Sequence, residues 1–357
     1  MAKILYAAST ASHIKSFHIP YIEALRDEGH TVLTLANGVG VDFDVPFTKR
    51  FFSVKNKKAR KMVKSIVDGG GFDAIVLNTA LAAFHIRLAL PKRHRPRVVN
   101  IVHGYLFHKD DRGLKARLLR FCERLVAKKT DKILVMNAED KAIADGDGLA
   151  KAPASEIPGM GASVRPPITE RAALSSELSL DGRFVIAFVG ELSDRKNQRF
   201  LISALPRIKS FIPTLTLCLV GDGAARDELT ALADRLSVSD SVVFAGYRQD
   251  ACDVIRLCDL YISASNIEGM PFNIIEALGL SKPIIASDIK GHRDLLSGGA
   301  GLLYTPESIE ELVLLVRSVY ENKITIDIST MRSVYSEYSF ENVFPRTFLM
   351  IKEAIFG

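Results

Sequence analysis

Short apolar runs recur along the whole chain and alternate with longer amphipathic stretches. Runs such as FVIAFVG at 184–190 and TLTLCLVG at 214–221 are apolar at nearly every position. The strands of a parallel sheet have this composition because helices cover both faces of the sheet. The alternation of such runs with helical periodicity therefore predicts βα units in an α/β fold.

The predicted strands fall into two series, one in each half of the chain. We expect them at 3–9, 31–37, 74–78, 98–104 and 132–137 in the first half, and at 184–190, 215–221, 242–246, 260–265, 283–287 and 301–304 in the second. In open parallel sheets, ligands bind beyond the carboxyl ends of the strands. The loops that follow these runs are therefore where functional residues are expected.

The length of 357 residues predicts about two domains. The segment PGMGASVRPP at 158–167 separates the two series of strands, and its glycines and prolines suit neither a helix nor a central strand. We therefore place a hinge in this segment, with one Rossmann-like domain at 1–163 and a second at 164–339.

Charge is unevenly distributed along the chain. Residues 1–165 hold 28 Lys and Arg against 16 Asp and Glu, an excess of +12, whereas the remaining residues hold 19 against 25, or −6. The basic half has no zinc finger, no RNA-recognition aromatic motif and no basic heptad region, so we expect no nucleic-acid partner. An anionic membrane surface or a phosphorylated acceptor fits the charge.

The chain contains no run of roughly 18 apolar residues that could span a membrane, and its opening segment is too short and becomes polar too soon for a signal peptide. We therefore expect a cytoplasmic protein. The four cysteines form no CxxC pair and no metal-binding spacing with histidine, so we expect buried thiols. They are Cys122, Cys218, Cys252 and Cys258.

The most informative segment is EGMPFNIIE at 268–276, which follows a predicted strand. Pro271 suits the first turn of a helix, so Glu268 falls in the loop and Glu276 inside the helix. Ionised carboxylates accept charge-assisted hydrogen bonds, which suits the hydroxyl groups of a sugar or ribose. The spacing alone agrees equally well with an ordinary solvated glutamate in a helix and another that favours a helix N-terminus.

A second candidate is the loop GELSDRKN at 190–197, where Gly190 leads to Arg195 and Lys196 near a predicted helix start. Backbone N–H groups combined with cations suit a diphosphate. The alternative is a charged loop capped by its own polar residues. Gly221 in the segment GDG permits either a close backbone approach or a tight turn.

Polar residues also follow two strands of the first half. His103 and Gly104 are the last two residues of the strand predicted at 98–104, at its carboxyl end, and Ser12 and His13 follow the first strand. These four residues could line an acceptor side, although a single histidine after a strand is more often structural. Farther on, the stretch 112–129 places Leu114, Leu118, Phe121, Cys122 and Leu125 on one helical face with basic residues around it. Both a membrane-surface helix and a core-packed helix with a solvated basic face fit this pattern.

Taken together, EGMPFNIIE, GELSDRKN, GDGAARDEL, GYRQD and SDIKGHRDLL resemble the donor domain of glycosyltransferase family four in order and spacing. ASHIKSFHIPYIEALRDEGHTV and VHGYLFH resemble the first domain of its capsule and exopolysaccharide branch. SFENVFPRTFLMIKEAI is similar to the last helix of the family, so we expect residues 340–357 to cross back to the first domain. The resemblance implies a GT-B fold of two Rossmann-like domains facing each other across a cleft.

The resemblance also implies roles for individual residues. Glu276 would hold the donor ribose, Glu268 the donor sugar hydroxyls and Lys196 the diphosphate, with His103 contributing from the other domain. The predicted catalytic set is therefore His103, Lys196 and Glu268. The remaining donor contacts would come from Gly190, Arg195, Gly221, Gly246, Tyr247, Arg248, Gly269 and Met270, and the acceptor side from Ser12, His13, His103 and Gly104.

The resemblance further implies retaining transfer from a nucleotide diphosphate sugar, UDP by default, to a polyprenyl-diphosphate-linked saccharide. The enzyme would be peripheral on the inner face of the plasma membrane. We expect no cofactor and no metal, and we interpret Asp145-Gly-Asp147, which matches the DxD metal pattern of another glycosyltransferase architecture, as a turn. Many family members carry Arg where this chain has Glu191. A nucleotide-sugar 2-epimerase of the same fold and a non-catalytic binding module are the alternatives.

Overall fold

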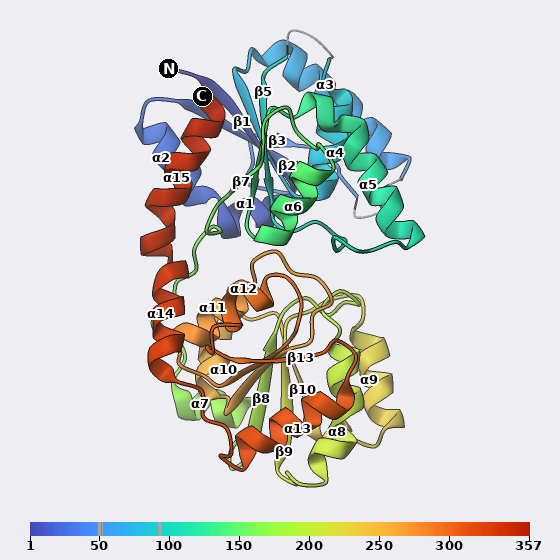
Figure 1. The fold of residues 1–357 in the computed structure, drawn as a ribbon, viewed down its shortest axis with the longest axis vertical. Helices are drawn as coiled ribbons and strands as arrows, with labels where there is room; N and C mark the ends of the chain where they lie inside the picture. Colours follow the sequence, from blue (N-terminus) through green and yellow to red (C-terminus); the bar gives the residue numbers. More distant parts are fainter. Residues whose placement is uncertain (49–50, 52, 92–94) are drawn as a thin grey trace. The chain divides into compact units, whose positions relative to one another are not determined.

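The computed structural model describes residues 1–48, 51, 53–91 and 95–357, and the chain divides into two compact units. The first unit comprises Met1–Met160 with Val343–Gly357, and the second Gly161–Asn342. Each unit contains one parallel sheet with helices on both of its faces (Figure 1). The predicted α/β class with two Rossmann-like sheets is thereby confirmed.

The first unit has a seven-stranded sheet in the order β3-β2-β1-β4-β5-β6-β7. Its apolar strands pack against α3 and α4 in a core that includes Leu5, Ile75 and Val63. Its elements are β1 (Lys3–Thr10), α1 (Ala11–Phe17), α2 (Ile19–Asp27), β2 (Thr31–Asn37), β3 (Phe43–Asp44), α3 (Lys55–Gly70), β4 (Ala74–Asn78), α4 (Ala80–Ala89), β5 (Arg97–Val102), α5 (Leu114–Val126), η1 (Ala127–Lys129), β6 (Lys132–Val135), α6 (Ala138–Gly146) and β7 (Ser155–Glu156).

The second unit has a six-stranded sheet in the order β10-β9-β8-β11-β12-β13. Its elements are α7 (Arg171–Glu177), β8 (Phe184–Val189), α8 (Gln198–Lys209), β9 (Leu215–Val220), α9 (Arg226–Arg235), η2 (Ser239–Ser241), β10 (Val242–Gly246), α10 (Ala251–Leu257), β11 (Leu260–Ser263), α11 (Phe272–Gly279), β12 (Ile284–Ser287), α12 (His292–Leu296), β13 (Leu302–Tyr304), α13 (Ile309–Tyr320) and α14 (Ile328–Tyr338).

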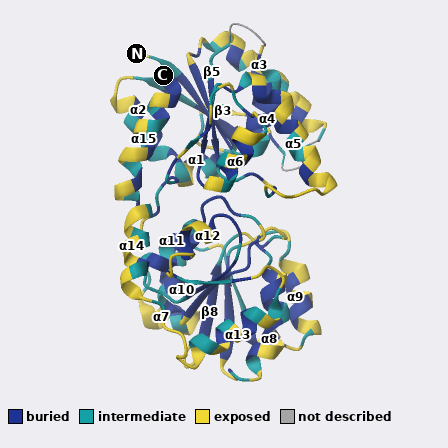
Figure 2. Ribbon diagram, viewed as in Figure 1, coloured by how far each residue is buried: buried dark blue, intermediate teal, exposed yellow. Residues whose placement is uncertain are grey.

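Burial follows the pattern predicted from the apolar runs. In Figure 2 the strands of both sheets are mostly dark, whereas the outer faces of the helices are exposed. All four cysteines are buried free thiols, as predicted. Several predicted strands end earlier than expected: β5 stops at Val102, which leaves His103 and Gly104 in a loop, and β11 stops at Ser263. The sequence pattern missed β3 and β7, which are two residues long and too short to show periodicity.

The C-terminal helix α15 (Phe340–Phe356) packs on the first unit, as predicted from the resemblance. Arg97 donates from Nε to the carbonyl of Ala354 at 2.7 Å, and Thr347 donates to the carbonyl of Gly159 at 2.9 Å. Two segments of the chain connect the units. They are joined by an isolated β-bridge between Ala162 and Ser339. The chain therefore leaves and re-enters the first unit at neighbouring positions.

Candidate functional site

The second unit has its topological switch point between β8 and β11. From β8 the chain builds outward through β9 to β10, then returns to place β11 on the other side of β8. The loops that follow β8 and β11 therefore lead away in opposite directions, which opens the crevice where ligands bind in doubly wound folds. These are the two loops that carry GELSDRKN and EGMP.

Three charged side chains meet between these two loops. Lys196 Nζ lies 2.5 Å from Glu268 Oε1, and Arg195 Nη1 lies 3.3 Å from Glu268 Oε2. Lys196 and Glu268 are both buried, whereas the Arg195 side chain is 40% exposed. The structure thus brings the predicted phosphate cation and the predicted sugar-binding carboxylate together as an ion pair, with Arg195 on its solvent side.

The two glutamates of the EGMPFNIIE motif are in opposite electrostatic environments. Burial disfavours the charged form of Glu268, but Lys196 and Arg195 outweigh this effect and lower its pKa to about 2. Burial raises the pKa of Glu276 to about 7, and a hydrogen bond with Cys252 and the charge of Arg165 offset only part of that increase. Glu268 is therefore permanently ionised near neutral pH, whereas Glu276 titrates there.

Hydrogen bonds and a close backbone contact connect the loops that follow β8 and β11. The amide of Asn266 donates to the carbonyl of Arg195 at 2.9 Å, and Asn273 Nδ2 donates to the carbonyl of Val189 at 2.7 Å. Gly291, at φ +81°, lies so close to the loop that an added Cβ would come within 2.7 Å of the carbonyl oxygen of Gly269. The carboxylate and the two cations are consequently fixed by loops that cannot move independently.

The glycines of the β8 and β9 loops contact each other. A Cβ on Gly221 would come within 2.0 Å of the carbonyl oxygen of Gly190, and one on Gly223 within 2.2 Å of that of Leu192. The sequence allowed either a tight turn or a close backbone approach at the GDG segment. The structure supports the close approach, here between two loops of the protein. A donor contact at Gly190 and Gly221 stays a prediction.

The residues predicted near the nucleobase follow β10. Gly246 has a φ of 69°, and the Tyr247 side chain is mostly exposed. Arg248 forms ion pairs with Asp250 and Glu177, each at 2.7 Å. These two carboxylates hold Arg248 in place, and its contact with a base stays a prediction.

The remaining predicted donor residues lie in or beside the same loops. Met270 is buried, Gly269 lies against Gly291, and the side chain of Glu191 is on the exposed face of the β8 loop.

Sequence reasoning missed His292, which is buried between Ser263 and Ser287. Burial lowers the pKa of His292 to about 4. The only sequence signal for His292 was its place in the segment SDIKGHRDLL.

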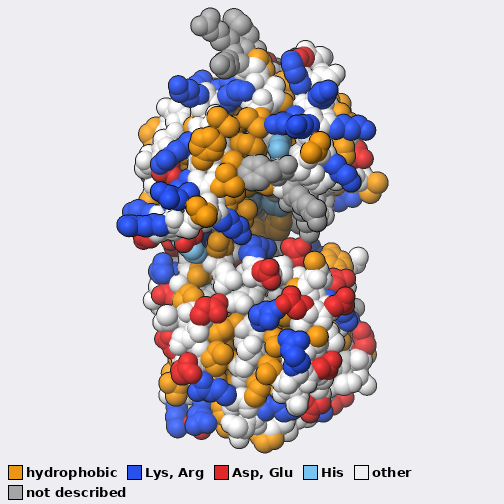
Figure 3. All heavy atoms as spheres, turned by 90° about the vertical axis from the view of Figure 1, so that its right-hand side faces the viewer, with side chains coloured by type: hydrophobic (Ala, Val, Ile, Leu, Met, Phe, Trp, Pro, Cys, Tyr) orange, Lys and Arg blue, Asp and Glu red, His pale blue; other side chains and the backbone are white. Residues whose placement is uncertain are grey.

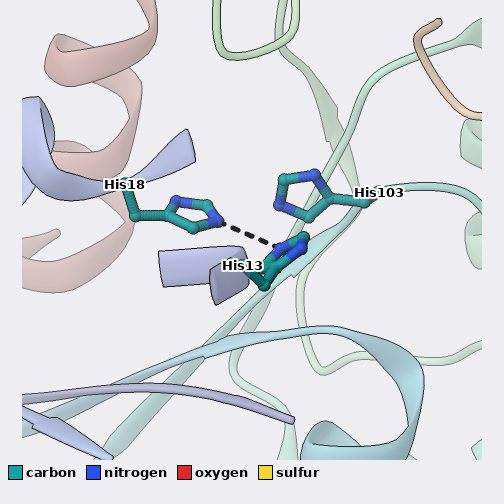
Figure 4. Close-up of side chains that lie close together, drawn as sticks. All are labelled: His13, His18 and His103. Carbon is teal, nitrogen blue, oxygen red and sulfur yellow. Dashed lines mark hydrogen bonds between the residues drawn. The ribbon is translucent and has the colours of Figure 1, made fainter. Parts of the chain in front are cut away.

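In the first unit, the predicted acceptor-side residues lie after β1 and β5. His13 and His103 are brought together with ring centroids 4.6 Å apart, and His18, which sequence reasoning missed, completes a cluster of three (Figure 4). Ser12 is exposed and donates to Thr10. Gly104 has a φ of 119°, a backbone conformation that favours glycine directly after His103.

Helix α5 exposes most of its apolar stripe. Leu114 is 84% exposed, and Leu118, Phe121 and Leu125 are exposed as well, whereas Cys122 is buried. Placing Cys122 on this stripe was therefore wrong, because it lies about 100° around the helix from Phe121. The reading of these four residues as a core-packed face is also wrong.

Basic residues surround this stripe. A surface hollow of about 680 Å³ is lined by Lys109, Asp110, Asp111, Arg112, Arg117, Arg120 and Arg124. Arg120 and Arg124 pair with Asp147. In Figure 3 the face that carries α5 shows Lys and Arg among exposed apolar side chains.

The DxD-like segment lies at the C-terminal end of α6, and Asp147 is the residue that follows the helix. Asp147 pairs with two arginines of α5, and Asp145 pairs with Lys141 at 2.8 Å. Asp145 also accepts from the amide of Ala154 at 2.7 Å. Both carboxylates therefore serve local structure. The prediction of a turn is correct only for Asp147, because Asp145 and Gly146 belong to the last turn of the helix. No described helix is long and apolar enough to cross a membrane.

Comparison with known protein families divides the chain in two. Residues 171–341 match the family described as glycosyl transferases group 1, and residues 21–158 match a glycosyl transferase 4-like domain. EpsD of Bacillus subtilis (strain 168), whose name assigns it to the glycosyltransferases, is 30% identical over 311 residues, covering 83% of this chain and 81% of EpsD.

A second relative is the Escherichia coli UDP-Gal:alpha-D-GlcNAc-diphosphoundecaprenol alpha-1,3-galactosyltransferase, which is 25% identical over 79% of this chain and 75% of its own length. Among solved structures, Anabaena HepE in complex with UDP and glucose has a TM-score of 0.78 at 20% identity, over 99% of this chain and 100% of that one. WaaG, a glycosyltransferase involved in lipopolysaccharide biosynthesis, has a TM-score of 0.77 at 14% identity, over 99% of this chain and 100% of that one. At these identities, the two structures establish the fold, which is GT-B.

Proposed function

Because this chain belongs to the group 1 glycosyltransferases, we propose that it transfers a sugar from a nucleotide diphosphate sugar, with retention of anomeric configuration and without a metal ion. The observation that carries the proposal is the Lys196–Glu268–Arg195 cluster at the switch point between β8 and β11. It offers a carboxylate for sugar hydroxyls and cations for a diphosphate in one place.

The diphosphate would enter at Arg195, the more exposed of the two cations. The diphosphate competes with Glu268 for hydrogen bonds from Lys196. Donor binding therefore redistributes the hydrogen bonds of the existing Lys196–Glu268 ion pair. The bond between the anomeric carbon and the diphosphate oxygen breaks as the acceptor oxygen forms its bond on the same face, and the acceptor proton passes to the leaving phosphate. Lys196 and Arg195 then stabilise the growing negative charge.

The other parts of the donor are assigned to neighbouring residues. Glu276 holds the ribose hydroxyls, Tyr247 and Arg248 lie beside the base, and the backbone of Gly269 and Met270 approaches the sugar. His103, in the first unit, is the third residue of the proposed catalytic set. UDP is the proposed nucleotide, because HepE was solved with UDP and the Escherichia coli relative uses UDP-Gal.

We further propose a polyprenyl-diphosphate-linked saccharide as acceptor, in surface polysaccharide synthesis. Two relatives act on undecaprenol-linked substrates by name, the Escherichia coli enzyme and a Campylobacter jejuni N-acetylgalactosaminyltransferase that is 30% identical over 43% of this chain and 39% of its own length. The exposed apolar stripe and basic surround of α5 suit peripheral attachment to the inner face of the plasma membrane.

The test is incubation of the purified protein with labelled UDP-sugars, with and without undecaprenyl-diphosphate-linked saccharides, in excess EDTA. We expect label in the lipid-linked product with the anomeric configuration of the donor. Release of a rearranged free sugar would support a 2-epimerase instead, and donor binding without any product would support a binding module. Loss of transfer in EDTA that Mg²⁺ or Mn²⁺ restores would contradict the metal-free mechanism.

A further inference from the structure

Three histidines of the first unit converge although they come from separate segments. His13 lies in α1, His18 lies between α1 and α2, and His103 follows β5. One ring nitrogen of each lies within 4.8 Å of those of the other two. Figure 4 shows the three rings turned toward one another.

The spacing of this cluster is close to that of metal-bound imidazoles. His18 Nε2 and His13 Nε2 lie 3.4 Å apart. Two nitrogens that are each about 2.0–2.1 Å from a tetrahedral Zn²⁺ lie about 3.4 Å from one another. The other separations in the cluster are at most 4.8 Å, so they would have to close by no more than about 1.4 Å to reach this value. Two of the three ligands are therefore already at coordination distance from each other.

The three imidazoles are neutral, as metal ligands must be. Burial lowers the pKa of His13 to about 4, and burial together with the neighbouring histidines lowers the pKa values of His18 and His103 well below the usual range. His103 Nε2 is buried and has no hydrogen-bond partner among the described residues. Leaving a buried polar atom unsatisfied is unfavourable, so this nitrogen has capacity for a ligand.

A second contact orients one of the rings. His18 Nδ1 lies 3.3 Å from the hydroxyl of Tyr6, and both side chains are fully buried. When Nδ1 carries the proton and donates to Tyr6, the lone pair of His18 is on Nε2, which faces His13. Metal-binding histidines characteristically have such a partner on the other ring nitrogen.

We propose that His13, His18 and His103 bind one divalent transition-metal ion, with Zn²⁺ as the best fit to three imidazoles. Three protein ligands leave a fourth position for water or another ligand. The sequence alone does not indicate this site, because His103 is far along the chain from the other two. The proposal does not depend on the proposed transfer reaction, whose donor chemistry uses no metal.

The test is equilibrium dialysis of the EDTA-stripped, full-length protein against micromolar Zn²⁺, with the visible spectrum of the Co²⁺ form as a second readout. We expect one equivalent of metal per chain and a tetrahedral Co²⁺ spectrum. His18→Gln and His13→Gln should each lower Zn²⁺ affinity by more than about 100-fold, and Tyr6→Phe by about 10- to 100-fold.

His30→Gln is the matched control. His30 lies in the same unit but accepts from the amide of Ala2 and stacks on Phe356, outside the cluster. It should keep the full equivalent of Zn²⁺. Thermal unfolding in EDTA checks that each variant is folded, and the partly exposed His13 serves if His18→Gln is not folded. Absence of Zn²⁺ binding, or binding that persists in the folded His13→Gln variant, would overturn the proposal.

A second experiment measures the effect of Zn²⁺ on sugar transfer, and it rests on the proposed function. Metal binding takes up the lone pairs of His13 and His103, the predicted acceptor-side histidines, so saturating Zn²⁺ should lower transfer and EDTA should restore it. If Zn²⁺ binds stoichiometrically but transfer is unchanged, the metal site stands and the role of His103 in transfer is wrong.

Discussion

Each unit gathers polar side chains at the carboxyl edge of its sheet, but the two clusters differ in charge. In the second unit, Lys196, Arg195 and Glu268 are charged and satisfy one another. In the first unit, three histidines lie together without charge, and His103 Nε2 lacks a partner among the described residues. Burial opposes charge at both places, but only the second unit supplies opposite charges that overcome it.

This difference bears on what each cluster can bind. In a cluster of ion pairs, an anionic ligand can replace the carboxylate as the partner of a cation. Such a cluster therefore suits a diphosphate. A neutral imidazole cluster offers lone pairs, so it suits a hydrogen-bond donor or a metal ion. The experiments below test the comparison from its largest expected effect to its smallest.

Lys196→Ala should have the largest effect, because it leaves Glu268 buried without its closest counter-charge. Breaking a buried pair costs about 3–5 kcal/mol of stability. Turnover should fall more than donor binding, since negative charge grows toward the transition state. Urea unfolding and steady-state kinetics measure the two effects. Lys141→Ala, which breaks an exposed pair with Asp145, should cost at most about 1 kcal/mol. Wild-type turnover in Lys196→Ala would show that the loop is structural.

Substitution of the two motif glutamates should separate binding from turnover. Above pH 7, where Glu276 is ionised, Glu276→Ala should weaken donor binding by about 1.5–3 kcal/mol, because the proposed charged partner of the ribose hydroxyls is lost. Glu268→Ala should chiefly lower turnover, since in the proposed mechanism Glu268 holds the reacting sugar. Calorimetric titration with UDP and initial-rate kinetics distinguish the two. Equal and negligible effects of both substitutions would remove this motif from the donor site.

The same glutamates should give stability opposite dependences on pH. The lowered pKa of Glu268 means that its contribution is present above about pH 4.5 and is lost as pH falls toward 2. The raised pKa of Glu276 means that stability is lost as pH rises from about 4.5 through about 7. Urea unfolding across this range should show that Glu276→Gln removes the loss at higher pH and Glu268→Gln the loss at lower pH. Parallel profiles for the two variants would contradict the assigned environments.

The first unit should attach to membranes through α5. Phe121→Ser should weaken binding to anionic vesicles without a large loss of stability, because the side chain is 61% exposed. Arg117→Glu should weaken it further, since each basic residue near the surface contributes about 1 kcal/mol. Vesicle sedimentation measures both. Leu314→Ser, at an equally exposed position of α13, is the control. Binding that is unchanged at high salt would contradict an electrostatic contribution.

The smallest effect is expected at Glu191, which is exposed beside the cations of the β8 loop. If its side chain reaches the diphosphate, Glu191→Arg should raise donor affinity modestly by removing repulsion. Calorimetric titration with UDP detects the change, and Asp222→Arg on the neighbouring loop tests for a general effect of charge. An unchanged affinity would place Glu191 outside the phosphate contacts.

The sequence by itself determined the fold and the local placement of the EGMPFNIIE motif. All eleven predicted strands formed, because a strand buried on both faces must be apolar throughout its length. Glu268 and Glu276 are eight residues apart on one loop and helix, so local rules placed them. The strand ends at Val102 and Ser263 were beyond this reasoning, since pairing with neighbouring strands decides where a ladder stops.

Only the tertiary structure decided which side chains meet. The pairing of Lys196 with Glu268 depends on β11 returning to the side of β8, a crossover that no local pattern encodes. The three histidines meet because β1 and β5 end at the same edge of one sheet, although the chain between them is long. The tertiary structure also determined the pKa values of the two motif glutamates. Two glutamates of one motif have pKa values on either side of the usual one, since Lys196 and Arg195 outweigh the burial of Glu268, whereas Arg165 offsets only part of the burial of Glu276.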